Sequence, residues 1–400
     1  MHNIRKITDD LFWIGASDHR LALFENVYPI PQGVSYNSYL LVDDKTVLLD
    51  TVDSSVSRQF FENLYAALAG RVLNYMIINH MEPDHCAEVA NIKRVYPDVK
   101  IVCNLQTKKM IGQFFDMPLS DDDFVLVKEN DVLETGRHKL TFISAPMVHW
   151  PEVMMTYDLN DKILFSADAF GTFGALNGNI FADEADFAAD YMDEARRYYT
   201  NIVGKYGPQV ATVLQKAAGV EIKMICPLHG FIWRENFADF VEKYARWASY
   251  TPEEKGVVIA YGSIYGNTYN AVSVLATKLA ERGVKNIKMY DVSVTHGSYI
   301  LSQMFRYSAV VFAAPTYNAG IFINMENLLH DVTAHNLQNR VIGLIDNGTW
   351  AATAGKQMKT ELEKLKNCTF VEPTVSVKSA LKDDQLATVE ELADALVSAM

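Results

Sequence analysis

The sequence predicts an α/β protein with two domains. At 400 residues the chain is longer than a single hydrophobic core usually serves. Its first part alternates hairpin-like and helical patterns, and its last part alternates short apolar runs with segments of helical length. Between them, the segment 250–256 is polar and contains Pro and Gly, as linkers often do. We therefore expect one domain over residues 1–250 and a second over residues 255–400.

Hairpins define the first predicted domain. The apolar runs 39–42 and 47–49 flank a polar turn, and the runs 153–157 and 163–166 flank a second one. Helical patterns separate such pairs along the chain. We expect an α/β domain rich in antiparallel strands.

The second predicted domain contains apolar runs separated by segments of helical length. Strands joined through helices pair in parallel through right-handed crossovers, and the helices cover both faces of the sheet. The length, roughly 145 residues, suits one doubly wound domain. The runs are Val257 to Tyr261, Ile287 to Tyr290, Ala309 to Ala313 and Val341 to Ile345.

Composition and charge limit the classes of function. Hydrophobic residues make up 49% of the chain and charged residues 21%, which predicts an ordered globular protein. The net charge of −13, without a cluster of Lys or Arg, argues against nucleic acid or an anionic membrane as a partner. The N-terminus has no apolar signal region and no run of about 18 apolar residues occurs, so we expect a cytoplasmic protein.

The cysteines provide no metal module and no disulfide framework. Cys86, Cys103, Cys226 and Cys368 are widely separated and form no C-x-x-C pair, which excludes a built-in rubredoxin or zinc ribbon. Any electrons that the protein uses must therefore come from another protein or a soluble donor.

The segment His80-Met81-Glu82-Pro83-Asp84-His85 places four potential metal ligands within six residues, directly after an apolar run. It resembles the H-x-H-x-D-H motif of the metallo-β-lactamase fold with Glu82 in place of a histidine. Imidazole-rich sites suit zinc, whereas mixed carboxylate and imidazole sets are the usual environment of non-haem iron. The segment therefore favours iron and redox chemistry over zinc hydrolysis.

Three more potential ligands follow predicted strands further along the chain. His149, Asp168 and His229 each lie just past an apolar run, where the loops of an α/β sheet commonly form a site. Each residue taken alone would more simply cap a turn or lie at the surface. Their order and their common position at strand ends favour a dinuclear metal site, in which three carboxylates offset most of the charge of two divalent ions.

The loops after three strands of the second domain predict a flavin site. The first loop opens a helix that runs to about Glu281, and its hydroxyls and backbone N–H groups suit a phosphate, as in the flavodoxin phosphate loop. The other two loops offer aromatic faces, although Tyr265, Tyr317 and Trp350 could equally be exposed loop residues. No G-x-G-x-x-G motif is present, so FMN is favoured over a dinucleotide. The candidate residues are Ser263, Ile264, Tyr265, Gly266, Asn267 and Thr268, then Pro315, Thr316, Tyr317, Asn318, Ala319 and Gly320, and finally Asn347, Gly348, Thr349 and Trp350.

Together, these motifs resemble the flavodiiron proteins, also called A-type flavoproteins, over essentially the whole chain and in their simplest, two-domain class. The resemblance implies a metallo-β-lactamase-like αββα domain followed by a flavodoxin-like doubly wound parallel sheet. It also implies reduction of O2 to water, of NO to N2O, or of both. By the resemblance, one iron takes His80, Glu82 and His149, the other takes Asp84 and His229, and Asp168 bridges them. His85 matches a position that ligates iron only in some members.

The resemblance also implies partners. Family members form head-to-tail dimers, or dimers of such dimers, in which the FMN of one subunit faces the diiron site of the other. Their donor is rubredoxin or, in related archaeal enzymes, reduced F420. The loop 346–352 departs from the Gly/Ser-rich form of many members, which leaves its flavin contacts open. We expect Tyr198 to place a phenol near the metal pocket as a hydrogen-bond or proton donor, with helix packing as the alternative.

Two other functions are compatible with parts of the pattern. A dinuclear metal hydrolase of the metallo-β-lactamase type could carry the second domain as a regulator, but Glu82 and the complete flavodoxin-like loops argue against it. An electron-transfer protein with a vestigial metal site is disfavoured by the complete ligand set. The sequence does not distinguish O2 from NO as the preferred substrate, since the same ligands serve both.

Overall fold

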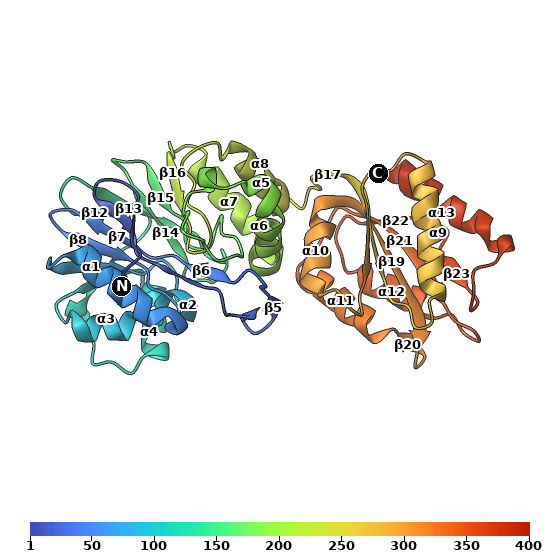
Figure 1. The fold of residues 1–400 in the computed structure, drawn as a ribbon, viewed down its shortest axis with the longest axis horizontal. Helices are drawn as coiled ribbons and strands as arrows, with labels where there is room; N and C mark the ends of the chain where they lie inside the picture. Colours follow the sequence, from blue (N-terminus) through green and yellow to red (C-terminus); the bar gives the residue numbers. More distant parts are fainter. The chain divides into compact units, whose positions relative to one another are not determined.

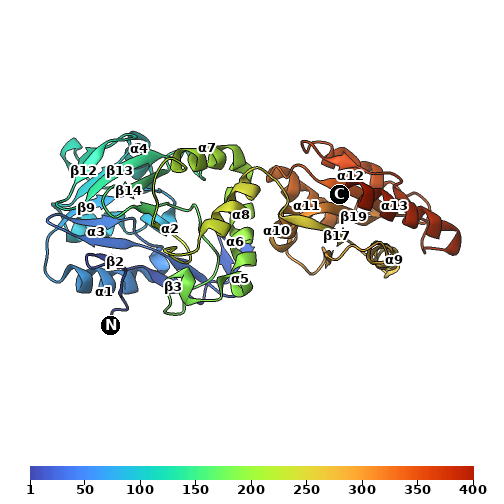
Figure 2. The ribbon, with the colours of Figure 1, turned by 90° about the horizontal axis from the view of Figure 1, so that it is seen from above.

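The computed structural model describes residues 1–400 and divides into two compact units. The first comprises Met1–Tyr199 and Pro208–Glu242, and the second comprises Thr200–Gly207 and Lys243–Met400. Figures 1 and 2 show both units from two directions. The α/β class predicted from the sequence is confirmed.

Two sheets form the centre of the first unit. In the seven-stranded sheet, the order is β1-β2-β7-β8-β9-β10-β11, and in the five-stranded sheet it is β12-β13-β14-β15-β16. The strands are β1 (Arg5–Lys6), β2 (Leu11–Trp13), β7 (Tyr39–Val42), β8 (Thr46–Leu49), β9 (Leu73–Ile77), β10 (Lys100–Cys103), β11 (Phe124–Leu126), β12 (Val132–Glu134), β13 (Lys139–Ser144), β14 (Met154–Asp158), β15 (Ile163–Phe165) and β16 (Met224–Cys226).

The predicted hairpins form, but the first unit is less antiparallel than the sequence suggested. Strand β7 pairs antiparallel with β8, and β14 pairs antiparallel with β15. From β8 to β11, however, neighbouring strands are parallel, and so are β15 and β16. Helices connect several of these strands, and a parallel pair needs such a crossover. Two small sheets pair β3 (Ala16–Asp18) with β6 (Val34–Tyr36) and β4 (Leu23–Phe24) with β5 (Tyr28–Pro29).

Helices flank the two sheets. In Figure 1, α1 to α4 lie on one side of the strands, and α5 to α7 lie on the other. Local signals fix helix ends: the Asn104 side chain caps α4 by accepting from Thr107 N, and α1 ends where Ala69 adopts a left-handed conformation. The bounds are α1 (Ser57–Leu68), α2 (Pro83–Cys86), α3 (Val89–Val95), α4 (Leu105–Phe114), α5 (Phe187–Asp190), α6 (Met192–Tyr198), α7 (Gly207–Ala217) and α8 (Ala238–Ala248).

The second unit contains one parallel sheet with the order β18-β17-β19-β21-β22, and β23 also pairs with β21. This is the 2-1-3-4-5 order of a doubly wound sheet, so the predicted parallel architecture is confirmed. The strands are β17 (Glu254–Tyr261), β18 (Ile287–Asp291), β19 (Tyr307–Tyr317), β20 (Gly320–Ile321), β21 (Val341–Asn347), β22 (Thr369–Phe370) and β23 (Val375–Val377).

The prediction of a loop over residues 315–320 in the second unit is wrong in part. Residues 315–317 continue strand β19 instead of leaving the sheet after residue 313. They do so because β19 turns back on β20 in a short hairpin. Asn318 and Ala319 make that turn with positive φ angles of 49° and 60°.

Helices cover the sheet of the second unit. Apolar side chains of α9 and α13, such as Leu275 and Leu392, pack against inward residues of the strands, such as Ile259 and Val311. Full burial of such a side chain contributes about 1.5–3 kcal/mol. Strand β17 is buried continuously over residues 256–260, which requires cover on both faces. The helices are α9 (Asn267–Glu281), α10 (Gly297–Arg306), α11 (Ile323–Ala334), α12 (Ala354–Leu362) and α13 (Leu386–Ala399).

Candidate functional site

The predicted metal ligands lie at the ends of strands from both sheets of the first unit. His80 follows β9, and His149, Asp168 and His229 follow β13, β15 and β16, respectively. Glu82 precedes α2 in an extended conformation, with Pro83 as the first residue of that helix. The short helix therefore places Asp84 and His85 beside Glu82, and the loops bring all the predicted ligands together.

The first ligand group consists of His80, Glu82, His149 and Asp168, whose ligand atoms lie within 4.8 Å of one another. The Nε2 atom of His149 lies 3.0 Å from Glu82 Oε2 and 3.0 Å from Asp168 Oδ2. His80 Nε2 lies 3.2 Å from Glu82 Oε2. Two imidazoles and two carboxylates thus face one point.

The second ligand group consists of Asp84, His85 and His229. The two Nε2 atoms of His85 and His229 are 3.0 Å apart, and His229 Nε2 lies 3.2 Å from Asp84 Oδ2. Asp168 connects the groups, because its Oδ1 lies 3.1 Å from His85 Nε2 while its Oδ2 faces His149. The structure places Asp168 where a bridging ligand would lie.

The electrostatics of this pocket favour positive charge. Burial alone would lower the pKa of His149, but the carboxylates of Asp168 and Glu82 outweigh it and raise that pKa to about 9. The pKa of buried His80 is likewise raised well above its usual value, mainly by Asp168. Burial would raise the pKa of Asp168, yet the neighbouring imidazoles lower it well below its usual range. The imidazoles of His80 and His149 therefore hold protons at the place where metal cations would bind.

The donor set fits two divalent metal ions. Imidazole and carboxylate ligands in these proportions suit iron, manganese or zinc, and the carboxylates balance the charge of a metal pair. The buried Oδ1 of Asp84 has no hydrogen-bond partner, although such atoms normally have one. A metal ion in the second ligand group would satisfy it.

Sequence reasoning missed Glu152 and Asp50, which hold the first ligand loop. Glu152 Oε1 lies 2.8 Å from His80 Nδ1 and accepts from Met81 N at 2.9 Å. Asp50 Oδ1 accepts from Asn79 N at 2.7 Å and from His80 N at 3.3 Å. Burial raises the pKa of Asp50 to about 6, even with these hydrogen bonds. Nothing in the sequence marks these acids, apart from the position of Glu152 three residues after His149.

Tyr198 and Glu25 also lie next to the metal pocket. The ring of Tyr198 is buried with its centroid 5.5 Å from that of His229. It also packs edge-on against Phe173, so its predicted donor role stays a prediction. Glu25, in the turn between β4 and β5, was missed by sequence reasoning. Glu25 is exposed as a residue, but partial desolvation of its carboxyl group and the neighbouring Glu82 raise its pKa to about 8.

The predicted flavin loops surround a cavity of about 460 Å³ at the carboxyl ends of β17, β19 and β21. All the candidate residues line it except Gly266 and Gly320. Gly266 instead precedes α9 with a φ of 89°, a conformation that favours glycine. No charged side chain lines the cavity, and Tyr265 and Trp350 are 90% and 93% exposed at its rim.

Ala351, Thr353 and Ser379 line the same cavity and were missed by sequence reasoning. Ser379 follows β23, so the order of strands in the sheet brings it beside a loop more than 30 residues earlier. Its backbone N–H donates to Asn347 Oδ1 at 3.1 Å, and its hydroxyl lies 3.0 Å from that of Thr349. No local pattern around Ser379 signals this position.

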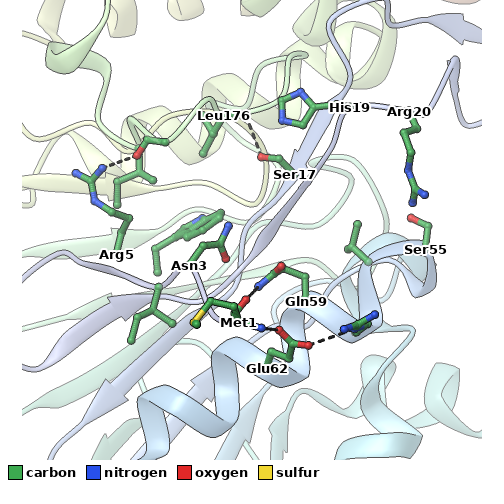
Figure 3. A pocket seen from close by; sticks show the side chains of 16 residues that line it. Met1, Asn3, Arg5, Ser17, His19, Arg20, Ser55, Gln59, Glu62 and Leu176 are labelled. Carbon is green, nitrogen blue, oxygen red and sulfur yellow. Dashed lines mark hydrogen bonds and ion pairs between the residues drawn. The ribbon is translucent and has the colours of Figure 1, made fainter.

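A larger cavity, of about 910 Å³, lies elsewhere in the first unit and is lined by none of the predicted ligands (Figure 3). Its arginines already have acidic partners. Arg5 pairs with Glu184 at 3.2 Å, and Arg58 pairs with Glu62 at 3.2 Å. The cavity therefore does not compete with the metal pocket as a candidate reaction site.

Comparison with known proteins agrees with the fold of both units. Residues 34–230 match the family described as ODP family beta lactamase, and residues 259–391 match flavodoxin. The chain is 31% identical over 362 residues to an anaerobic nitric oxide reductase flavorubredoxin from Aeromonas hydrophila, covering 89% of this chain and 72% of the relative. It is 30% identical over 384 residues to the protein of the same name from Escherichia coli, covering 95% of this chain and 78% of the relative.

Among solved structures, the rubredoxin oxygen:oxidoreductase from Desulfovibrio gigas is similar with a TM-score of 0.90 and 27% identity, covering 99% of this chain and 98% of that one. Fold and sites define a protein that joins a metallo-β-lactamase-like unit to a flavodoxin-like unit. The chain belongs to the flavodiiron protein family, and the resemblance drawn from its motifs is confirmed. None of its helices has the length and apolar composition needed to cross a membrane.

Proposed function

We propose that this protein is a flavodiiron oxidoreductase that reduces O2 to water, NO to N2O, or both, at a non-haem diiron site supplied with electrons through FMN. The observation that carries the proposal is the pair of buried ligand groups that share Asp168. A hydrolase with a regulatory second domain is not supported, since the relatives that cover most of this chain are named as nitric oxide reductases and an oxygen oxidoreductase.

The ligand assignment is part of this proposal. His80, Glu82 and His149 would hold one iron, and Asp84 and His229 the other. Asp168 would bridge the two irons through its two oxygens. We place His85 with the second iron, because its Nε2 faces Asp168 and His229.

When bound, the iron pair supplies electrons and Lewis acidity, and FMN accepts and passes electrons. The chain itself holds these groups and shapes their surroundings. Its loops around the 460 Å³ cavity provide hydroxyl and backbone groups for FMN. We propose that the phenol of Tyr198, whose buried ring lies 5.5 Å from that of His229, donates a hydrogen bond or a proton to the metal pocket.

Partners and location complete the proposal. The names of the relatives, a flavorubredoxin and a rubredoxin oxygen:oxidoreductase, support a rubredoxin-type electron donor, with reduced F420 as the alternative. We propose a head-to-tail dimer or a dimer of such dimers, and domains over residues 1–250 and 255–400. A cytoplasmic location is supported by the cysteines, which are all free thiols, as is usual in a reducing compartment.

The direct test is anaerobic purification of the full chain, followed by metal and flavin analysis and parallel measurements of O2 and NO consumption. We expect two irons and one FMN per chain and consumption of at least one gas. In Asp168→Ala, gas reduction should be lost while FMN stays bound. Asp158→Asn, which changes a buried acid paired with His138 instead of a ligand, is the matched control and should retain activity. Full activity in Asp168→Ala would contradict the proposed bridge.

A further inference from the structure

We propose that Glu152 is a positioning residue that makes the two metal positions unequal. Its carboxylate accepts the Nδ1 proton of His80, so the metal held by His80 is bound more tightly, and its oxidised state is favoured more, than for the metal held by His229. This inference rests on the proposed dinuclear site.

The contact between Glu152 and His80 is direct and fully buried. Glu152 Oε1 lies 2.8 Å from His80 Nδ1, and both side chains are 0% exposed. His80 presents Nε2 to the ligand group, so with a metal bound Nδ1 carries the proton and donates a hydrogen bond to the carboxylate. A negatively charged acceptor makes the imidazole a stronger donor to a metal and fixes the orientation of its ring.

In the second metal position, neither imidazole donates a hydrogen bond from Nδ1 to a carboxylate, and Asp50 acts on His85 only through space. His229 Nδ1 donates to the backbone carbonyl of Ser35 at 2.7 Å, and His85 Nδ1 has no hydrogen-bond partner. A neutral carbonyl polarises an imidazole less than a carboxylate does. Besides the different ligands themselves, the two positions therefore differ in the carboxylate that accepts a hydrogen bond from His80.

The loop has supports besides Glu152, and a glutamine at this position keeps an oxygen that can accept from Met81 N. Asn79 donates to both oxygens of Asp50 at 2.7 Å, and its own Oδ1 accepts from Thr156 Oγ1 at 2.7 Å. The backbone of Glu152 is held separately, since Asn104 Nδ2 donates to its carbonyl oxygen at 2.6 Å. The other carboxylate oxygen of Glu152, Oε2, has no partner. A glutamine can therefore replace Glu152 with the loop in place.

The test compares Glu152→Gln with the wild-type chain. Glutamine keeps the shape and a neutral acceptor, so the variant removes only the charge. The matched control is Asp158→Asn, which neutralises a buried carboxylate 2.6 Å from His138 Nδ1, away from the predicted ligands. Each full-length protein is loaded with ⁵⁷Fe and examined by Mössbauer spectroscopy. Graded chelation then measures the affinity for each iron, and FMN content and unfolding temperature report on the fold.

We expect the wild-type chain to release its two irons in separate steps. Glu152→Gln should weaken the tighter step by about 10- to 100-fold. It should shift one of the two iron spectra and raise one of the two reduction potentials. The looser step and the FMN content should not change, and Asp158→Asn should keep the wild-type steps of iron release and the wild-type iron spectra, even where its unfolding temperature falls.

Equal release of both irons by the wild-type chain, or unchanged release by Glu152→Gln, would overturn the inference while leaving the dinuclear site intact. Equal weakening of both irons would also overturn it, because that result indicates a general loss of structure. A wild-type chain that binds fewer than two metal ions would instead overturn the proposed function, and this inference with it.

Discussion

The metal pocket of the first unit and the flavin cavity of the second are built in opposite ways. The metal pocket buries titratable side chains, with His80 0% and Asp168 1% exposed. The flavin cavity is open and no charged side chain lines it, and Trp350 at its rim is 93% exposed. Buried charge needs a compensating ion, whereas an uncharged cavity at strand ends binds through hydroxyls, backbone groups and aromatic faces. The first unit should therefore depend on its ligand for stability far more than the second.

Metal removal should have the largest effect. Without cations, the largely buried carboxylates of Glu82, Asp84 and Asp168 have only imidazoles as cationic partners. Metal binding at 1,000 times Kd contributes about 4 kcal/mol. We expect chelation to lower the unfolding temperature of the first unit by roughly 10 °C. Calorimetry of the full chain would measure this, with flavin removal as the comparison. The contrast would be broken if flavin removal destabilised the second unit as much as metal removal destabilises the first.

A third group of His and Asp residues, Asp10, His138 and Asp161, differs from the metal pocket because its charges are balanced without a metal. His138 lies 2.6 Å from Asp158 and 2.9 Å from Asp10, and the guanidinium of Arg137 already occupies the cation position, 2.8 Å from Asp10. Burial would lower the pKa of His138, but the hydrogen bonds to Asp158 and Asp10 raise it from 6.5 to about 9. Equilibrium dialysis of the chain should therefore find the two metal ions of the metal pocket and no third ion at this group.

The titration of His138 gives a pH dependence of stability. Because its pKa is raised on folding, the imidazolium stabilises the first unit fully below pH 6.5, and this contribution is lost as the pH rises through about 9. The loss is on the order of 3 kcal/mol. Urea unfolding of the metal-loaded protein between pH 6 and pH 9.5 would measure it. Asp158→Asn should flatten that dependence, and an unchanged slope in this variant would refute the assignment to His138.

In both sites, the sequence reveals residues that belong to a local pattern at a strand end. It does not reveal residues that reach the site only through the folded structure. The candidate metal ligands, which the structure brings together, could be named from the sequence because His, Glu and Asp at strand ends have few other reasons to occur in that order. Glu152 and Asp50 were missed, since their roles depend on contacts with the backbone and with His80 that no spacing reveals. Ser379 was missed because the order of strands, not the local sequence, brings it to the flavin cavity.

A substitution at Thr268, which lines the flavin cavity, tests whether that cavity binds FMN. It is 2% exposed, and its hydroxyl accepts from Asn347 Nδ2 at 3.4 Å. Thr268→Phe should overpack the loop, at a cost of about 1–3 kcal/mol. FMN affinity should fall at least tenfold while the iron content stays unchanged. The control is Thr277→Phe, at an exposed position of the same helix. Normal flavin content in Thr268→Phe would count against the phosphate-loop assignment.

Trp350 should have the smallest effect of these changes. Its side chain is almost fully exposed, so Trp350→Ala should leave folding unchanged. If its ring stacks on the flavin, the loss should be about 0.5–1.5 kcal/mol of binding, or roughly 3- to 10-fold in affinity. Quenching of FMN fluorescence during a titration would measure this. Unaltered affinity would mean that Trp350 is only an exposed loop residue.

The central claim is that Asp168 joins two buried ligand groups into one dinuclear iron site. Mössbauer and electron paramagnetic resonance spectra of the anaerobically purified, ⁵⁷Fe-loaded chain test it most directly. We predict two irons per chain with the spectra of a magnetically coupled pair, and loss of that coupling in Asp168→Asn. Two uncoupled irons, a single iron, or a site that retains zinc in preference to iron would contradict the account.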